Sequence, residues 1–350
     1  MPKQYVVLGA GVVGLSTALE VKSRIPDAKV IIAAKFFPGD RSVEYCSPWA
    51  GANWMTMATD NGVQEEWDAE TYRRFAYLAD NVPEAAITRM PIRAFFDRPI
   101  EEAEVLSKGT GKIWYDELTG GIQPIPKDEL PSGSFFGMVV STFMVNTQGY
   151  LCWLNAQCLK QGIEMRRTSY GDIRQVFQDI PADAYFNCTG LGSYHLRGVE
   201  DKNLYPTRGQ VMLVETPKTP LKTMYFRSPR RVDSDTTYVF PRHPSGGVIL
   251  GGCRVDNDWN GEPDLGFAED IKKRCCALAP ELGKPEDLKV IYHAVGLRPS
   301  RKGGPRVEPE TIDGKLVVHN YGAGGAGYQS SWGTAKHAVD HMMNQSKARL

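Results

Sequence analysis

The sequence predicts an α/β protein in which a Rossmann-like nucleotide-binding domain is interleaved with an α+β domain that contains an antiparallel sheet. Three observations support this prediction. An apolar strand runs into a glycine turn and a helix at the N-terminus, a second glycine-rich turn separates a strand from a helix near the C-terminus, and short alternating strands occupy residues 205–294. With 350 residues, 42% of them hydrophobic, the chain is long enough for two domains.

The first element is a βαβ unit with a parallel sheet. Residues 5–8 form a short buried strand, a glycine turn follows at 9–14, a helix covers 15–24 and a second strand covers 30–34. This order is typical of a dinucleotide site, in which the N-terminus of the helix presents unpaired N–H groups and the positive end of its dipole to a pyrophosphate.

The glycines of the turn match the spacing GxGxxG. We expect Gly9 to permit the tight turn, Gly11 to let the pyrophosphate approach, and Gly14 to let the helix contact the strand. The acidic residue that usually follows the second strand is absent, because the chain has Ala34 and Lys35 there. Lys35 suits a 2′-phosphate or other adenosine phosphate oxygens, so this motif alone leaves NADP and FAD open.

The later elements set the expected domain boundaries. Strands at 183–190 and 315–322 and a C-terminal helix at 333–350 belong with the βαβ unit. The remaining segments contain a helix at 65–79 followed by a Pro-, Gly- and aromatic-rich stretch, and then the short strands. We therefore predict that the nucleotide domain comprises 1–60, 141–204 and 295–350, and that the substrate domain comprises 61–140 and 205–294.

Composition excludes several classes of partner. Forty-one Lys and Arg residues balance 41 Asp and Glu residues, which gives no overall field for nucleic acid. No apolar run is long enough to span a membrane, and no signal peptide is recognisable. Seven cysteines without metal-type spacing favour a reducing compartment, and His337 and His341 are expected to be surface residues, so no metal site is predicted.

The run VVHNYGAGGAGYQSSWGTA, residues 317–335, carries the strongest signal in the chain. It resembles the signature of the FAD-dependent D-amino-acid oxidases. SPWAGANW (47–54) is similar to the family's flavin-ring loop, TYVFPR (237–242) to its substrate tyrosine strand, and GLRP (296–299) to its carboxylate-binding turn. Ala34-Lys35 is similar to the Ala-Arg pair of fungal relatives, which explains the missing acidic residue without invoking NADP. The resemblance as a whole implies noncovalently bound FAD.

The resemblance and the glycine turn together imply a set of cofactor-binding residues spread over the whole chain. They are Gly9, Ala10, Gly11, Val12, Val13, Gly14, Lys35, Ser47, Gly51, Ala52, Asn53, Ser169, Thr189, Gly190, Arg298, Gly324, Gly325, Ala326, Gly327, Tyr328 and Gln329.

The implied substrate site binds an amino acid through its α-carboxylate and α-amine. Arg298 offers a planar, permanently charged fork for the α-carboxylate, and Tyr238 donates a hydrogen bond to the same group. The Gly325 carbonyl accepts from the α-amine, and Gln329 completes the set. The resemblance implies that no protein acid or base is required. Hydride leaves Cα for the flavin, water hydrolyses the imine to a 2-oxo acid and ammonia, and dioxygen becomes hydrogen peroxide.

Arg254 is expected to bind the substrate's side chain. The position matches an arginine of the D-aspartate oxidase branch, as does Arg231, so we expect acidic D-amino acids such as D-aspartate to be substrates. A buried arginine without an anion is costly, which supports a substrate carboxylate as its partner. The alternative is that Arg254 pairs with Asp256 or Asp258 and that the enzyme is a broad D-amino-acid oxidase. A catalytically silent flavin-binding module is a third hypothesis, against which Arg298 and Tyr238 together argue.

The last three residues, Ala348-Arg349-Leu350, resemble a variant of the Ser-Lys-Leu peroxisomal address. We therefore expect a peroxisomal location and an import receptor as a partner, and the sequence leaves a homo-oligomer open.

Overall fold

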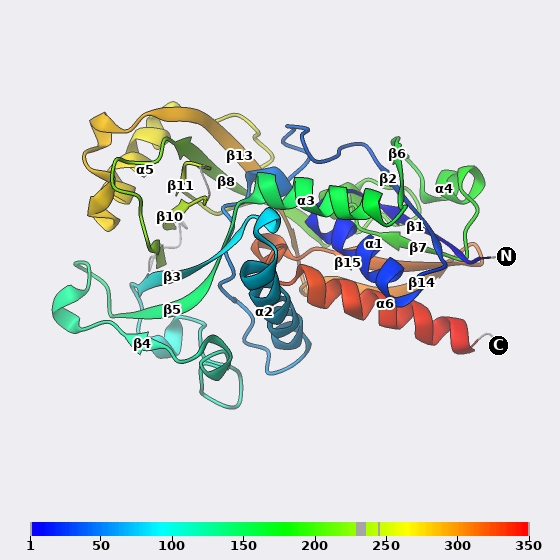
Figure 1. Cartoon of the computed structure of the whole chain (residues 1–350), viewed down its shortest axis with the longest axis horizontal. Helices are drawn as coiled ribbons and strands as arrows, with labels where there is room; N and C mark the ends of the chain where they lie inside the picture. Colours follow the sequence, from blue (N-terminus) through cyan, green and yellow to red (C-terminus); the bar gives the residue numbers. More distant parts are fainter. Residues whose placement is uncertain (1, 229–235, 244–245, 349–350) are drawn as a thin grey trace. The chain divides into compact units, whose positions relative to one another are not determined.

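The computed structural model describes residues 2–228, 236–243 and 246–348, and the side chains as far as residue 345 (Figure 1). The chain divides into two compact units. Unit 1 comprises Met1–Pro48, Gln148–Pro206 and Arg298–Leu350, and unit 2 comprises Trp49–Thr147 and Thr207–Leu297. The expected crossings at residues 60, 140, 204 and 294 fall instead at 48, 147, 206 and 297. The largest difference, twelve residues, places the segment 49–60 in unit 2.

Unit 1 is built on a sheet that has six strands among the described residues, in the order β14-β15-β7-β1-β2-β6. These strands are β14 (Arg306–Ile312), β15 (Lys315–Tyr321), β7 (Ala184–Asn187), β1 (Gln4–Leu8), β2 (Lys29–Ala34) and β6 (Glu164–Arg167). All neighbours are parallel except β14 and β15. The central position of β1, between β2 and β7, is that of a doubly wound nucleotide-binding fold.

The helices of this unit are α1 (Val12–Arg24), α3 (Thr147–Lys160, of which Thr147 belongs to unit 2), α4 (Ile173–Asp179) and α6 (Ser331–Ala348). Figure 1 shows α1 and α6 side by side, and the indole N–H of Trp332 on α6 donates to the Tyr150 hydroxyl of α3 at 2.8 Å. Ile173 and Val176 of α4 form an apolar core with Val6 and Ile31 of the sheet. The helices predicted at 15–24 and 333–350 are confirmed, each with an earlier start and the second as far as Ala348, the last described residue.

Unit 2 is built on a larger sheet, in the order β12-β8-β11-β10-β9-β3-β5-β4 with β13 paired to β8. The strands are β12 (Val255–Asp256), β8 (Leu204–Val214), β11 (Val248–Gly251), β10 (Thr237–Pro241), β9 (Met224–Ser228), β3 (Ile87–Phe96), β5 (Phe136–Val145), β4 (Gln123–Pro124) and β13 (Val290–Arg301). Residues 204–206 of β8 and 298–301 of β13 belong to unit 1. The α+β class with an antiparallel sheet is confirmed, with one correction, because β3 and β9 pair in parallel.

Among its described residues this unit also has the helices α2 (Val63–Asn81) and α5 (Leu265–Leu278). Across the two units, short 3-10 turns occur at Ser47–Trp49, Pro83–Ala85, Ile100–Glu102, Glu117–Thr119, Lys127–Glu129, Gly190–Tyr194, Pro280–Leu282, Pro285–Asp287 and Gly324–Ala326. Ile271 and Cys275 of α5 pack on Met212, Val239 and Leu250 of the sheet, which buries its apolar face.

The long antiparallel pair of β3 and β5 lies in the segment that the sequence marked only as rich in Pro, Gly and aromatic residues. Pro91 interrupts β3 and weakens the strand pattern, because proline donates no ladder hydrogen bond. In the structure Pro91 pairs with Ser141 on one side only, since the parallel neighbour β9 begins its pairing at Ile92. The position therefore tolerates the missing N–H.

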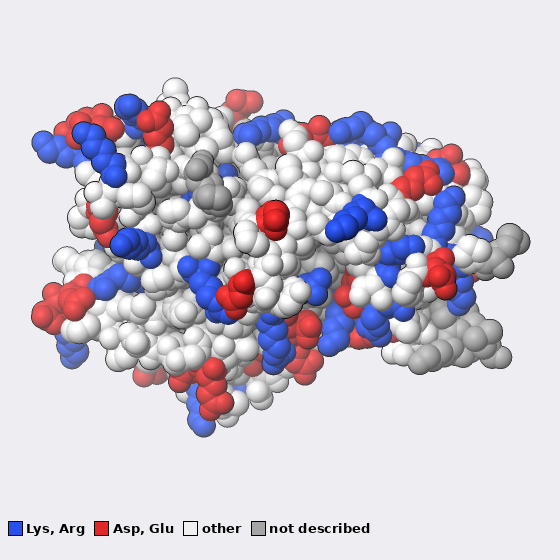
Figure 2. All heavy atoms as spheres, viewed as in Figure 1, with Lys and Arg blue, Asp and Glu red and all other residues white. Residues whose placement is uncertain are grey.

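None of the described helices is both long and apolar enough to cross a membrane. Over the face shown in Figure 2, positive and negative side chains are interspersed, as the balanced composition predicts.

Candidate cofactor and substrate site

The glycine turn of unit 1 is a place where side chains do not fit. Gly9 has a φ of +102°, and a Cβ there would lie 2.5 Å from the Cys188 carbonyl oxygen. A Cβ on Gly14 would lie 2.0 Å from the Gly9 carbonyl oxygen. The N–H of Gly9 donates to the Ala33 oxygen at 3.0 Å. The roles predicted for Gly9 and Gly14, a tight turn and a close helix–strand contact, follow from these distances.

Three segments distant in sequence meet at the start of α1. The Ser47 hydroxyl accepts from the Val12 N–H at 3.1 Å, and the Tyr328 hydroxyl donates to the Ser47 carbonyl oxygen at 2.8 Å. The Tyr45 hydroxyl donates to the Ala10 carbonyl oxygen at 2.7 Å, and burial raises its pKa well above the ordinary value. The tertiary structure thus brings Ala10, Val12, Ser47 and Tyr328 together.

These residues fit the pyrophosphate of a dinucleotide. Gly11 keeps the space at the helix start open, since a Cβ there would lie 2.9 Å from the Ser47 hydroxyl. The first turn of an α-helix presents N–H groups that have no intrahelical acceptor, and these groups suit phosphate oxygens.

Arg298 lies in the same unit, between two cofactor motifs. The next residue, Pro299, would be 3.9 Å from a Cβ on Gly190, and Ser300 Oγ would be 3.1 Å from one on Gly324. Burial raises the pKa of the Cys46 thiol to about 11, and the positive charge of Arg298 opposes that shift. The two residues that follow Arg298 therefore adjoin the Gly190 and Gly324 turns, and Gln329, which is 5% exposed, lies in the same unit.

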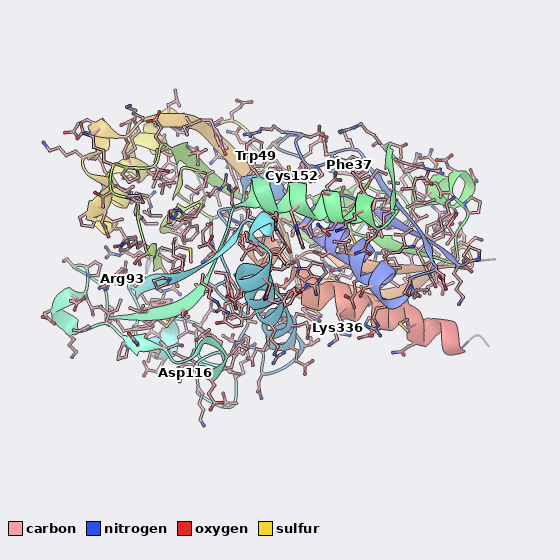
Figure 3. All side chains as sticks on the ribbon, viewed as in Figure 1. Phe37, Trp49, Arg93, Asp116, Cys152 and Lys336 are labelled. Atoms are coloured by element: carbon pink, nitrogen blue, oxygen red, sulfur yellow. The ribbon has the colours of Figure 1, made fainter. Side chains whose placement is uncertain are left out.

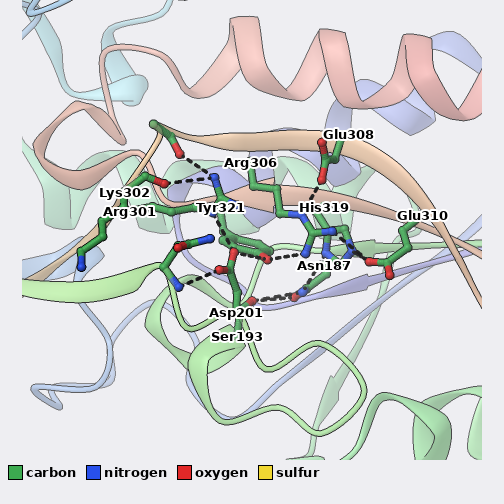
Figure 4. A network of polar contacts seen from close by, with 12 residues as sticks. Asn187, Ser193, Asp201, Arg301, Lys302, Arg306, Glu308, Glu310, His319 and Tyr321 are labelled. Atoms are coloured by element: carbon green, nitrogen blue, oxygen red, sulfur yellow. Dashed lines mark hydrogen bonds and ion pairs between the residues drawn. The ribbon is translucent and has the colours of Figure 1, made fainter.

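A buried polar chain that includes Asn187 and His319 (Figure 4) also holds Thr189. Asn187 Oδ1 accepts from both the N–H and the hydroxyl of Thr189, at 3.2 and 2.8 Å. Because that oxygen is the acceptor, Asn187 Nδ2 is the donor to His319 Nδ1 at 3.2 Å. His319 is consequently neutral, and its Nε2–H donates to Glu310 at 2.9 Å.

The chemical environment agrees with a neutral His319. The ring is fully buried, and desolvation together with the nearby charge of Arg306 lowers its pKa to about 4. The chain continues from Arg306 through the Tyr321 hydroxyl to Asp201, at 3.0 Å for each hydrogen bond, and Arg301 pairs with Asp201 at 2.7 Å. The sequence matched His319 to a signature without assigning it a role and missed Asn187, because a single Asn in a strand carries no local signal.

The end of β2 holds the residues predicted for the adenosine side. Ala34 pairs in register with Arg167 of β6, so Lys35 and Ser169 follow neighbouring strands at the same sheet edge. Lys35 forms an ion pair with Glu44, and Arg167 pairs with Asp40, whose pKa it lowers through a hydrogen bond. The guanidinium of Arg167 also lies 5.3 Å from the centre of the Phe37 ring, which Figure 3 labels.

In unit 2, Tyr238 lies on β10 directly opposite Gly251 of β11. A Cβ on Gly251 would fall 2.5 Å from the Tyr238 hydroxyl oxygen, and one on Gly252 would fall 2.9 Å from it. The ring of Tyr238 stacks on Phe240 with 4.9 Å between centroids and 17° between planes. The two glycines after the strand therefore make room for the tyrosine that was predicted to contact substrate.

The segment predicted to face the flavin is ordered by β5. Ala52 exchanges two backbone hydrogen bonds with Val145, at 3.1 and 2.9 Å, and the Trp54 N–H donates to the Phe143 oxygen at 2.9 Å. Trp49, labelled in Figure 3, meets Tyr292 edge to face with 6.3 Å between ring centroids. Gly51, Ala52 and Asn53 thus lie in unit 2 with Tyr238.

Arg254 follows β11 and is partly exposed, with its NH2 group 3.2 Å from the Met57 sulfur. The two acids considered as its partners have other contacts. Asp256 accepts from the Thr207 hydroxyl at 2.6 Å, and Asp258 lies 3.6 Å from Nε of Arg208. Arg231 lies outside the described residues.

The parallel sheet, the glycine turn and the start of α1 define a dinucleotide-binding protein. Comparison with known families makes the class specific, since residues 4–341 match the family described as FAD dependent oxidoreductase (DAO). The chain belongs to the D-amino-acid oxidase family of FAD-dependent oxidoreductases. The prediction of FAD is confirmed, and NADP, which the glycine motif left open, is set aside.

Relatives extend along the whole chain. It is 39% identical to a D-amino-acid oxidase of Schizosaccharomyces pombe over 344 residues, which cover 97% of this chain and 95% of that protein. It is 30% identical to a D-aspartate oxidase of Talaromyces thermophilus over 378 residues, covering 100% and 98%. Among solved structures, glycine oxidase from Geobacillus kaustophilus shares the fold, with a TM-score of 0.76 at 16% identity and coverage of 98% and 95%.

Proposed function

We propose that this protein is an FAD-dependent oxidase of D-amino acids with a preference for acidic side chains. FAD, when bound, would supply the chemistry by accepting a hydride from the substrate's Cα. Water hydrolyses the resulting imine to a 2-oxo acid and ammonia, and dioxygen takes up the two electrons to form hydrogen peroxide. The observation that carries the proposal is that Arg298 directly precedes Pro299 and Ser300, which adjoin the Gly190 and Gly324 turns of the cofactor-binding unit.

The protein's contribution is to hold the amino acid. Arg298 pairs with the α-carboxylate through its planar fork, and Tyr238 donates to the same group from a rigid strand. The Gly325 carbonyl accepts from the α-amine, and Gln329 contributes a buried amide. No side chain transfers a proton in the oxidation, because the amine's own lone pair drives the departure of hydride.

The acidic preference rests on Arg254, with Arg231 as a second cation. Asp256 and Asp258 contact Thr207 and Arg208, and the proposal assigns the substrate's side-chain carboxylate to Arg254. A whole-length relative that is a D-aspartate oxidase agrees with this preference. The second candidate is a broad D-amino-acid oxidase acting on neutral substrates, which the higher identity to the Schizosaccharomyces pombe enzyme favours.

Anaerobic mixing of the FAD-loaded protein with D-aspartate, D-alanine and L-aspartate separates these candidates. We expect fast bleaching of the flavin by D-aspartate, slower bleaching by D-alanine and none by L-aspartate. A preference for D-alanine would favour the broad oxidase. Bleaching by neither D-amino acid, with FAD bound, would overturn the proposed function.

We also propose a peroxisomal location through Ala348-Arg349-Leu350, of which Arg349 and Leu350 lie outside the described residues. An enzyme that releases hydrogen peroxide is suited to a compartment that destroys it. A fluorescent fusion ending in the native tail should appear in peroxisomes and bind their import receptor, whereas the same fusion lacking Leu350 should remain diffuse. A diffuse native fusion would contradict the proposal.

A further inference from the structure

Arg242 follows strand β10 and is 2% exposed. Its Nε donates to the Gly51 carbonyl oxygen at 2.8 Å, and its NH2 donates to the Ala50 carbonyl oxygen at 2.7 Å. The same NH2 donates to the Thr147 hydroxyl at 2.9 Å, just beyond the end of β5. One guanidinium therefore holds two successive carbonyls of the 50–53 segment and ties them to a neighbouring chain segment.

Phe240 fills the space between this clamp and Tyr238. A Cβ on Gly51 would lie 2.5 Å from the Phe240 ring, so only glycine lets the 50–53 segment reach that ring. The Phe240 ring also stacks on Tyr238, and Tyr238 in turn covers Gly251. Tyr238, Phe240 and Arg242 are two residues apart along the chain, the period that places side chains on one face of a strand.

The contacts form a continuous column within unit 2, which runs from Arg242 and Gly51 through Phe240 to Tyr238 and Gly251. The far side of the 50–53 segment is fixed by the backbone pairing of Ala52 with Val145. Because interiors are close-packed, a change in the Phe240 ring or in the clamp displaces the segment relative to Tyr238.

We propose that Arg242 and Phe240 are positioning residues that set the spacing between the Tyr238 hydroxyl and the 50–53 segment. The inference rests on the proposed function, in which Tyr238 contacts the substrate and Gly51, Ala52 and Asn53 lie along the flavin. Hydride transfer requires the two reactants to be held in a near-attack geometry, and a displacement of about 1 Å can cost roughly 100-fold in rate. The proposed function assigns the contacts with substrate and flavin to Tyr238 and the 50–53 segment, so Arg242 and Phe240 act through these neighbours.

Arg242→Lys keeps the charge but lacks the fork that bridges two carbonyls. Phe240→Leu keeps an apolar side chain but removes the ring between Gly51 and Tyr238. The matched control is Arg227→Lys on β9, where the arginine pairs with Asp97 at 3.0 Å and donates to the Ser132 oxygen at 2.7 Å. Arg227 lies opposite Thr237 of β10 in register, but its side chain holds Asp97 and Ser132 and not the 50–53 segment.

Two measurements on the FAD-loaded proteins test the proposal. The first is the rate of anaerobic flavin reduction at saturating D-alanine, which we expect to fall about 10- to 100-fold in Arg242→Lys and Phe240→Leu and less than twofold in Arg227→Lys. The second is amide hydrogen exchange of residues 49–54, which should accelerate at least about tenfold in Arg242→Lys alone, as expected when a local structural constraint is lost.

Reduction rates within twofold of the wild type in both site variants, or equal losses in the control, would overturn the positioning role. Unchanged exchange at 49–54 in Arg242→Lys would overturn the clamp itself. The exchange measurement does not depend on activity. Failure of the wild type to be reduced by any D-amino acid, with faster exchange in the variant, would therefore refute the proposed function and leave the clamp supported.

Discussion

In unit 1 the residues predicted to bind FAD lie in short motifs, whereas in unit 2 the residues predicted to meet flavin and substrate come from strands far apart in sequence. Gly9 and Gly14 are five residues apart and constrain each other by direct contact. Tyr238, Gly251 and Gly51 meet only because β10 and β11 pair in register and Phe240 spans the remaining space. A motif defines the cofactor unit, and cross-strand packing defines the substrate unit.

The comparison separates two kinds of defect. Changes in the glycine turn of unit 1 act on FAD and hence on every substrate alike. Changes around β10 and β11 leave FAD bound and alter which substrate reacts, or how fast. The following predictions test this separation, from the largest expected effect to the smallest.

Gly14→Ala should abolish FAD binding. The new Cβ would lie 2.0 Å from the Gly9 backbone oxygen, a distance that no rotamer relieves, so α1 must leave β1. We expect the affinity for FAD, measured by flavin fluorescence, to fall by at least about a thousandfold, or roughly 4 kcal/mol. Gly171→Ala, where no atom lies within 4 Å of the added Cβ, is the control and should bind normally. Normal flavin content in Gly14→Ala would show that the turn tolerates side chains.

Arg254→Leu should act on acidic substrates only. Leaving the side-chain carboxylate of D-aspartate without its partner costs on the order of 3–5 kcal/mol, because a desolvated charge is then unpaired. At about 1.36 kcal/mol per factor of ten, kcat/KM for D-aspartate should fall roughly a hundred- to several-thousand-fold.

Neutral substrates such as D-methionine should keep or gain activity in Arg254→Leu, and Arg231→Leu should have a smaller effect on D-aspartate. The measurement is kcat/KM for both substrates in the wild type and both variants. Equal losses on D-aspartate and D-methionine would show that Arg254 serves the protein's own contacts, and the broad oxidase would then be the better description.

His319 should give unit 1 a stability that depends on pH. The unfolded chain binds a proton below its ordinary pKa of 6.5, whereas the folded protein takes it up only near pH 4. Stability therefore rises as the pH increases from about 4 to 6.5, is fully present above that window and is lost as the pH falls through it. Integrated over the window, the contribution is roughly 3 kcal/mol.

Urea unfolding of His319→Leu and the wild type at pH 7 and pH 4.5 measures this contribution. The variant should be less stable at pH 7, because Asn187 and Glu310 lose a partner, but its stability should fall less on acidification. His195→Asn, at an exposed position, is the control and should follow the wild type. Parallel pH profiles for His319→Leu and the wild type would contradict a neutral buried His319.

Much of unit 1 follows from the sequence, because its signals are local. The first strand, the glycine turn and the second strand are contiguous, and the C-terminal run 317–335 resembles a family signature. FAD and the family are confirmed on this basis. The site residues assigned through the resemblance remain predictions, and the structure places most of them within the two units as described.

The sequence by itself determined the nucleotide-binding unit, because the strand, the glycine turn and the helix are contiguous. A Cβ at Gly9 or Gly14 would lie 2.0–2.5 Å from a carbonyl oxygen, so these two positions accept no other residue. Only the tertiary structure decided the antiparallel pairing of β3 with β5, the tautomer of His319 and the clamp of Arg242 on residues 50 and 51. Those features depend on hydrogen bonds between residues up to 192 positions apart. Such pairings arise from strand register and side-chain packing, which a local pattern does not encode.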